Sequence, residues 1–183
     1  MSNSMKRGVS LPKIAIVGAE SSGKSMLAEA LAKQFNTLWV PEYLREFVDL
    51  HGRVPRAEEQ IGIAATQLAR EDALAEQAQN WLFCDTTPLM TALYSEHYFG
   101  SAEPALLGLA ADHAKRYALT LVTAPDTPWV ADGLQRESPA VRQQIHEQLL
   151  ALLEQREIAH VLVQGSLAAR LEQVDMFLSF LLA

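Results

Sequence analysis

Short apolar runs alternate with longer segments of helical periodicity along the chain. Five such runs are candidate strands, at 14–17, 37–40, 81–84, 119–123 and 160–163. The segments between and after them predict helices over 25–35, 43–50, 57–79, 88–98, 103–115, 139–152 and 166–176. Short, wholly apolar strands are typical of parallel sheets that helices cover on both faces. The pattern therefore predicts an α/β fold of three layers around a five-stranded parallel sheet.

The segment over about 126–139 is the least regular part of the chain. Prolines and a glycine stand among charged residues there, and we interpret the segment as a small lid, with an ordinary surface loop as the alternative. Residues 1–12 include basic residues but lack the apolar stretch of a signal peptide, so we expect a flexible tail. The remaining residues, 13–183, have the length of one domain.

Composition narrows the classes of function. Lys and Arg number 15 against 22 Asp and Glu, a net charge of −7, which argues against a nucleic-acid partner. The single cysteine, Cys84, cannot form an internal disulfide, and the histidines lack the spacing of metal ligands, so we expect a reduced, cytoplasmic setting. No apolar run is long enough for a membrane span, so we expect no membrane partner. The sequence leaves open whether the protein forms a homo-oligomer.

One motif carries most of the chemistry. Residues 18–25 match G-x-x-x-x-G-K-[ST] at every fixed position, between an apolar run and an amphipathic segment. In such a phosphate-binding loop (P-loop), backbone N–H groups and the start of the next helix face the phosphates. Lys24 then reaches the terminal phosphates and the Ser25 hydroxyl binds Mg²⁺. We therefore expect ATP and Mg²⁺ as cofactors, with an ATP site formed by Gly18, Ala19, Glu20, Ser21, Ser22, Gly23, Lys24, Ser25 and Met26.

Two carboxylates follow predicted strands. Asp85 comes directly after the run 81–84 and is our candidate for a second Mg²⁺ ligand, although a helix cap is the alternative. Glu42 follows the run 37–40 and should reach the same edge of the sheet as the P-loop. There it could accept the proton of an attacking hydroxyl, with Asp85 as the other candidate base. The alternative is that Glu42 has only a structural role, in a surface ion pair with Arg45.

A single small domain of this kind favours a small-molecule kinase, and a GTPase is excluded because no Asn-Lys-x-Asp loop is present. The P-loop, the segment 40–47, the segment 83–100 and the segment 127–133 together resemble the NadR-type nicotinamide riboside kinase domain, over about residues 13–170. The resemblance implies ATP-dependent phosphorylation of the 5′-hydroxyl of nicotinamide riboside to nicotinamide mononucleotide, in NAD salvage. A kinase of another nucleoside and a non-catalytic ATP-binding sensor module are the alternatives.

The resemblance also implies roles for single residues. Catalysis would rest on Lys24, Glu42, Asp85 and a lid arginine, Arg136. Family members read Asp-Gly-Leu-Arg where this chain reads Asp-Gly-Leu-Gln-Arg at 132–136, so Arg142 is the alternative lid arginine. The acceptor would contact Glu42, Tyr43, Arg45, Trp129 and Asp132. Trp129 or Tyr43 could stack on a pyridinium ring, with Trp129 packed on the core as the alternative.

Overall fold

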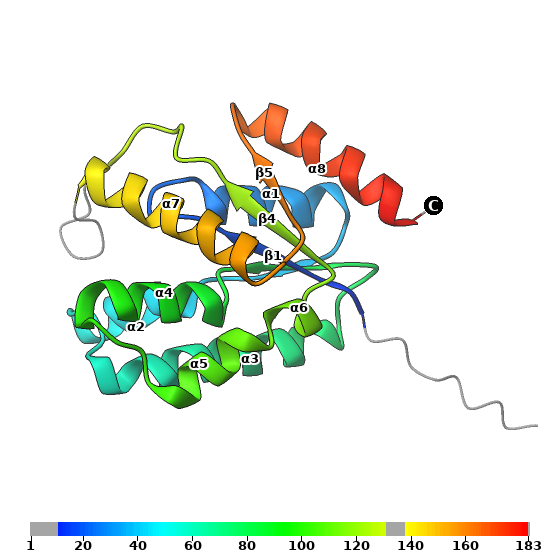
Figure 1. The fold of residues 1–183 in the computed structure, drawn as a ribbon. Coiled ribbons are helices and arrows are strands. Elements are labelled where there is room, and N and C mark those ends of the chain that lie inside the picture. The colour runs from blue at the N-terminus through cyan, green and yellow to red at the C-terminus, as the bar shows by residue number, and fades with distance from the viewer. Residues whose placement is uncertain (1–10, 131–137, 183) are drawn as a thin grey trace, which may run out of the picture.

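A computed structural model describes residues 11–130 and 138–182 of the chain. Its centre is a five-stranded sheet in the order β2-β3-β1-β4-β5 (Figure 1). All four pairings in this sheet are parallel. The strands are β1 Lys13–Val17, β2 Leu38–Val40, β3 Leu82–Asp85, β4 Leu119–Thr123 and β5 His160–Val163. The predicted α/β fold with a five-stranded parallel sheet is therefore confirmed.

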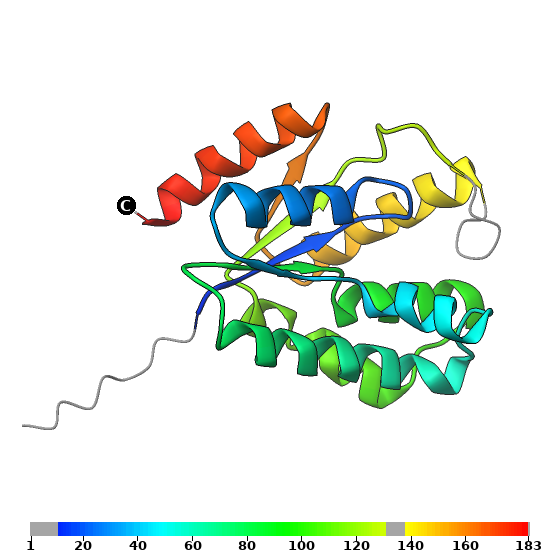
Figure 2. The same ribbon diagram turned by 180° about the vertical axis from the view of Figure 1, so that it is seen from behind.

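Helices cover both faces of this sheet (Figure 2). In chain order they are α1 Lys24–Gln34, α2 Tyr43–His51, α3 Gln60–Ala75, α4 Pro88–Phe99, α5 Pro104–Ala111, α6 His113–Arg116, α7 Pro139–Gln155 and α8 Leu167–Leu182, with a 3₁₀ turn, η1, over Ala57–Glu59. None of the helices in the described part of the chain is both long and apolar enough to cross a membrane.

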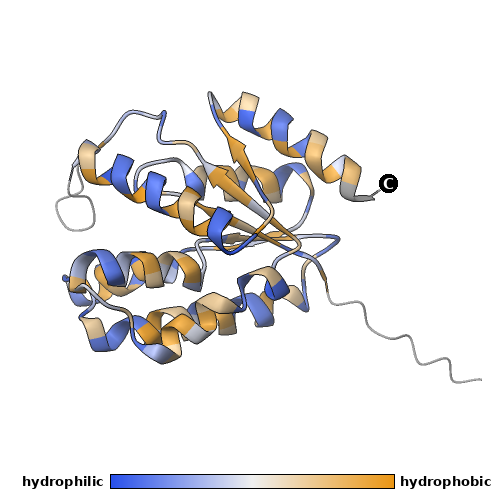
Figure 3. Ribbon diagram, in the orientation of Figure 1, coloured by the Kyte–Doolittle hydropathy of each residue, from blue (hydrophilic) through white to orange (hydrophobic). Residues whose placement is uncertain are grey.

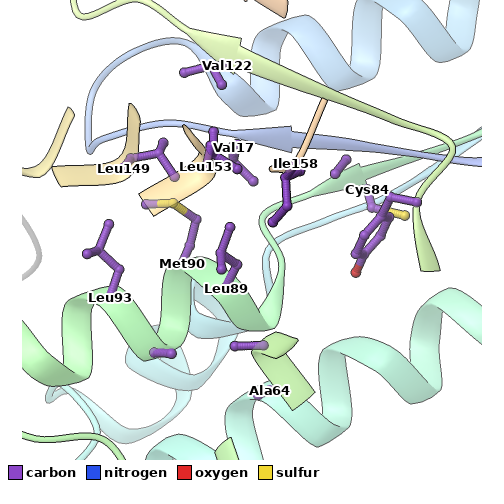
Figure 4. Close-up of a cluster of buried hydrophobic side chains, with 14 of the residues drawn as sticks. Val17, Ala64, Cys84, Leu89, Met90, Leu93, Val122, Leu149, Leu153 and Ile158 are labelled. Atoms are coloured by element: carbon purple, nitrogen blue, oxygen red, sulfur yellow. The ribbon is translucent and has the colours of Figure 1, made fainter. Parts of the chain in front are cut away.

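Alternate residues of the strands point into two separate cores, as the period of a β-strand requires. On one face Ile14 and Ile16 of β1 pack with residues of α1 and α8. On the other face Ala15 and Val17 join α3, α4, α5 and α7, and Figure 4 shows part of this cluster. The strands are apolar along their length whereas the helices carry polar residues on their outer sides (Figure 3). Burial on both faces explains why the strands read as continuous apolar runs.

Two predicted helices differ from the observed ones. The helix predicted over 103–115 is two helices, α5 and α6, which meet at Asp112. An aspartate side chain competes with the backbone for hydrogen bonds, so it favours helix ends over helix interiors. The helix predicted over 57–79 begins as the 3₁₀ turn η1 and ends at Ala75.

The C-terminal part of the fold also differs from the prediction. Helix α8 continues past 176 to Leu182, because Val174 and Leu178 extend its buried stripe by one more turn. Strand β5 lies at the edge of the sheet, where it pairs with β4, and its Leu162 is exposed. The apolar run 160–163 therefore predicted a strand correctly but not its place at an edge.

The site-forming segments follow from the parallel arrangement. The carboxyl ends of β1, β2, β3 and β4 lie at one edge of the sheet, where they lead into the P-loop, Glu42, the β3–α4 turn and the segment after Thr123. The predicted tail lies mostly, and the predicted lid partly, outside the described residues. Leu11 of the predicted tail is described and packs against the core on the α3 side.

Candidate active site

The P-loop is compact because two glycines hold conformations closed to other residues. Gly18 has φ +156°, and a Cβ there would lie 2.2 Å from Thr123 Oγ1 of β4. Gly23, with φ +86°, is the N-cap of α1. Between them, Ser22 Oγ donates to the carbonyl oxygen of Ala19 at 2.7 Å. The loop is thereby folded onto the end of β4, with α1 starting directly at its base.

The two chemically distinctive residues of the loop lie in the first turn of α1. Lys24 Nζ donates to the Ala19 carbonyl at 3.0 Å, so the lysine curls back over the loop. Ser25 Oγ donates to Asp85 Oδ2 at 2.5 Å. The register of β1 against β3 explains this contact, because it places Asp85 opposite Ile16, just before the P-loop. The structure thus brings together the two predicted Mg²⁺ ligands.

Asp85 is fully buried, and one of its oxygens is left over. Oδ1 is buried and has no hydrogen-bond partner among the residues that the structure describes. Burial, and next the negative charge of Glu42, raise the pKa of Asp85 to about 6, although Lys24 and Ser25 oppose the shift. A buried carboxylate oxygen without a partner is costly. The arrangement suits a cation that the loop and Asp85 hold together.

The donor set fits Mg²⁺ in particular. The described residues contain no group of three or more His, Cys, Asp and Glu side chains that could hold a metal on their own. Mg²⁺ does not require one, because it usually keeps several waters and takes one or two protein ligands plus phosphate oxygens. Ser25 and Asp85 supply such a pair of oxygen ligands.

Glu42 is the N-cap residue of α2 and lies near enough to Asp85 for its charge to raise the pKa of that carboxyl. Its carboxylate lies 4.0 Å from Arg45 Nη2, a loose pair in which the Glu42 side chain is 16% exposed and that of Arg45 is 54% exposed. The predicted ion pair therefore exists, but an exposed pair at this distance contributes little. Both residues also line the main cavity of the site. Glu42 thus has room to contact a bound molecule.

That cavity has a volume of about 570 Å³, within the range of small-molecule sites. Its lining includes residues of the P-loop, among them Glu20 and Lys24. Further lining residues come from the start of α2 and from Val54–Ala57 before α3. Aromatic residues at the end of α4, Tyr98 and Phe99, complete the lining. The cavity lining is therefore amphipathic, because it combines charged side chains with apolar and aromatic ones.

Comparison with known proteins agrees with this geometry. A family model described as an AAA domain matches residues 13–170. The chain belongs to this AAA-domain family. It is 33% identical over 156 residues to the trifunctional NAD biosynthesis/regulator protein NadR of Escherichia coli strain K12, a match covering 82% of this chain and 38% of NadR. The chain thus spans well under half the length of that curated relative.

Two crystal structures of NadR protein share the fold of this AAA domain. The complex with NR has a TM-score of 0.77 at 23% identity, covering 91% of this chain and 50% of that one. The complex with NAD and AMP-PNP has a TM-score of 0.75 at 22% identity, covering 91% and 48%. At these identities the likeness establishes the fold of the AAA domain.

Glu20 of the AAA domain is bound to α4, which the sequence did not indicate. Tyr94 Oη donates to Glu20 Oε2 at 2.7 Å and accepts from the Glu20 backbone N–H at 3.0 Å. Burial and the nearby Glu20 charge raise the pKa of Tyr94 well above its usual value. The Glu20 side chain thus contacts α4 and lines the cavity, and the ATP contact predicted for Glu20 as part of the loop stays a prediction.

Other predicted site residues lie away from the cavity. The ring of Tyr43 lies under the Arg70 guanidinium, 4.6 Å from its centroid, and packs beside Phe47. Trp129 is not part of the cavity wall, and Met26 is 63% exposed. The stacking roles of Tyr43 and Trp129 and the ATP contact of Met26 stay predictions. Asp132 and Arg136 lie outside the described residues, so their roles stay predictions.

Arg142 lies beside the P-loop. Its Nη1 donates to the carbonyl oxygens of Ser21 at 3.3 Å and Thr127 at 2.8 Å. Thr127 Oγ1 also donates to the Ser21 carbonyl, at 2.6 Å. The first turn of α7 thus brings a cation to the tip of the loop.

Arg170 of α8 is the residue that sequence reasoning missed most clearly. It is 2% exposed, and its Nη1 donates to the carbonyl of Ser22 at 2.5 Å. Its other nitrogens bind the carbonyls of Ala124 and Gly165 and the carboxylate of Asp126. A signal existed, because Arg170 stands four residues before Val174 on the buried stripe of its helix.

Proposed function

We propose that this AAA domain is an ATP-dependent kinase that phosphorylates the 5′-hydroxyl of nicotinamide riboside to give nicotinamide mononucleotide. The observation that carries the proposal is the cavity whose wall holds both Lys24 of the P-loop and Glu42 of α2, with buried Asp85 beside them. A phosphate-binding loop and a carboxylate with only a loose ion pair, lining one cavity, are what transfer from ATP to an alcohol requires. The similarity to NadR, named for NAD biosynthesis and crystallised with NR, supports this choice of acceptor.

The cavity suits a nucleoside with a flat cationic base. About 570 Å³ accommodates a small nucleoside, and the aromatic wall of Tyr98 and Phe99 offers faces to a ring. The carboxylates of Glu20 and Glu42 line the same space. They would offset the charge of a positive pyridinium ring, while Lys24, Arg45 and Arg56 of the same lining supply positive charge for phosphate groups. Nicotinamide riboside has a flat cationic ring of this kind.

ATP would place its phosphates over the P-loop. Lys24 would exchange its bond to the Ala19 carbonyl for the terminal phosphates, and Arg142 stands near enough to the loop to add a second positive charge. Ser25 and Asp85 would hold Mg²⁺. When bound, Mg²⁺ neutralises charge on the phosphates and orients them.

Glu42 is the better candidate for the base. Asp85 Oδ2 already accepts the Ser25 hydroxyl, and its remaining oxygen suits the metal. Glu42 lines the cavity with a single loose ion pair to Arg45. It would orient the 5′-hydroxyl and accept its proton.

The test is a transfer assay with ATP, Mg²⁺ and a panel of nucleosides that includes nicotinamide riboside. We expect the wild-type protein to form nicotinamide mononucleotide, detected by chromatography and mass. Lys24→Ala should form none while keeping its melting temperature. Lys33→Ala is the matched control, because Lys33 is an exposed lysine of the same helix. Tight ATP binding without transfer to any nucleoside would overturn the kinase proposal in favour of a sensor.

A further inference from the structure

Thr86 has the least expected backbone conformation of the described chain. Five non-glycine residues in the described ranges have positive φ: Ser21, Asn36, Asn80, Thr86 and Glu157. Among these five, Thr86 alone is β-branched, with φ +69°. A β-branched residue in this left-handed region is an outlier, because its side chain crowds the backbone there.

Thr86 occupies the turn between β3 and α4, but the turn itself does not require a threonine. It stands between Asp85, the last residue of β3, and Thr87, the N-cap of α4. Its backbone N–H donates to the Ile16 carbonyl at 2.9 Å, which continues the β1–β3 ladder by one bond. The chain must then leave the sheet abruptly. A glycine would make this turn without strain.

The hydroxyl of Thr86 differs from those of the other buried threonines. Thr87 and Thr120 share hydrogen bonds with the ring of His113 at 3.4 and 2.8 Å, and Thr123 bonds with Ser22 at 2.6 Å. Within residues 11–130 and 138–180 the Thr86 hydroxyl has no such partner, and its oxygen is accessible although the residue as a whole is only 8% exposed. It lines the cavity together with Lys24 and Glu42. The strained turn therefore leaves a hydroxyl without a protein partner in the lining that also holds Lys24 and Glu42.

We infer that the Thr86 hydroxyl donates a hydrogen bond to an oxygen of the phosphoryl group during its transfer. The inference rests on the proposed kinase function. The acceptor oxygen forms a bond to the γ-phosphorus and loses its proton to Glu42, while the bond to the bridging oxygen breaks and its electron pair leaves on ADP. A donor fixed in advance by the backbone stabilises the charge on that group without reorganising.

Three substitutions of Thr86 distinguish the effect of losing the hydroxyl from the effect of relieving the backbone strain. Thr86→Val keeps the branched shape but removes the donor, and we expect kcat to fall roughly ten- to a hundredfold, as for a lost bond to a charged group. The KM values of ATP and acceptor should stay within about threefold, since the bond matters mainly in the transition state. Thr86→Ser should keep most of the activity. Thr86→Gly should melt about 2–4 °C higher than wild type and yet be as slow as Thr86→Val.

A binding experiment tests the inference even without an acceptor. ADP with Mg²⁺ and aluminium fluoride mimics the transferring phosphoryl group. Thr86→Val should bind this mixture at least tenfold more weakly than wild type while binding ADP and Mg²⁺ alone equally well. Equal affinity for the mixture, an unchanged kcat, or a raised acceptor KM with unchanged kcat would each overturn the inference. If wild type phosphorylates no nucleoside, the proposed function fails, and the fluoride experiment still decides the role of Thr86.

Discussion

Buried carboxylates lie both where the strands of the sheet begin and where they end. They differ in whether their oxygens have hydrogen-bond partners. Glu71 of α3 lies at the edge where the strands begin, and burial raises its pKa to about 7. The Tyr117 hydroxyl bonds to both of its oxygens, at 2.9 and 3.1 Å, and Lys13 Nζ lies 3.6 Å away. Asp85, at the edge where the strands end, has an oxygen without a partner in the described chain. A raised pKa alone therefore does not mark the site, whereas an unsatisfied oxygen does.

Glu42→Gln should have the largest effect at the ligand-binding edge. If Glu42 is the base, turnover falls by about 10²–10⁴-fold, while the acceptor binds with nearly its original affinity because glutamine keeps the size and one acceptor oxygen. Steady-state kinetics with varied acceptor measure both quantities. Glu46→Gln, an exposed glutamate one turn along α2 that pairs with Arg70, serves as the control. Turnover within a few-fold of wild type would leave Glu42 as a partner of Arg45 and move the base to Asp85.

Asp85→Asn should lower turnover by roughly 10²–10³-fold, because a bound metal contributes several kcal/mol to stabilising the transferring group. The Mg²⁺ concentration for half-maximal rate should rise, and ATP binding without metal should change less. Glu71→Gln is the matched control, since it removes a charge of similar burial and raised pKa from the opposite edge. The predicted helix-cap alternative does not hold, because the N-cap of α4 is Thr87, so superimposable Mg²⁺ titrations of Asp85→Asn and wild type would show that Asp85 does not hold the metal.

Glu71→Gln should leave turnover unchanged and alter only the pH dependence of stability. The folded pKa of Glu71 is raised from 4.5 to about 7, so the folded state holds its proton where the unfolded state has lost it. The bound proton therefore stabilises the folded state. Its contribution to the free energy of unfolding is fully present below pH 4.5 and is lost as the pH rises through 7, and it amounts to about 3 kcal/mol at most. Denaturant unfolding between pH 5 and 8 should show a shallower decline for the variant. Parallel curves would show that Glu71 titrates normally.

The sequence predicted the frame of the site well. Five apolar runs and one motif placed the P-loop, Glu42 and Asp85 at a common edge, because the carboxyl ends of parallel strands must meet there. Local pattern could not supply contacts between distant residues. The Glu20–Tyr94 pair and the bond from Arg170 to Ser22 join residues 74 and 148 positions apart.

The contacts of aromatic side chains are harder to read from the sequence. The stacking roles of Tyr43 and Trp129 stay predictions, and the contact of Tyr43 with Arg70 joins residues 27 positions apart. The aromatic residues in the cavity lining are Tyr94, Tyr98 and Phe99 of α4, which belong to the segment 83–100 that carries the family resemblance. Positive φ at Thr86 left no trace in the residue pattern, since threonine is among the residues least suited to it.

The hydrogen bonds of Arg170 couple the stability of the P-loop to that of helix α8. One guanidinium joins α8 to the P-loop at Ser22, to the end of β4 at Ala124 and to the turn at Gly165. Local fraying of α8 would release all three segments together. Backbone amides of the P-loop should therefore exchange their hydrogens at a rate set by the opening of α8, a helix almost 150 residues away in the chain.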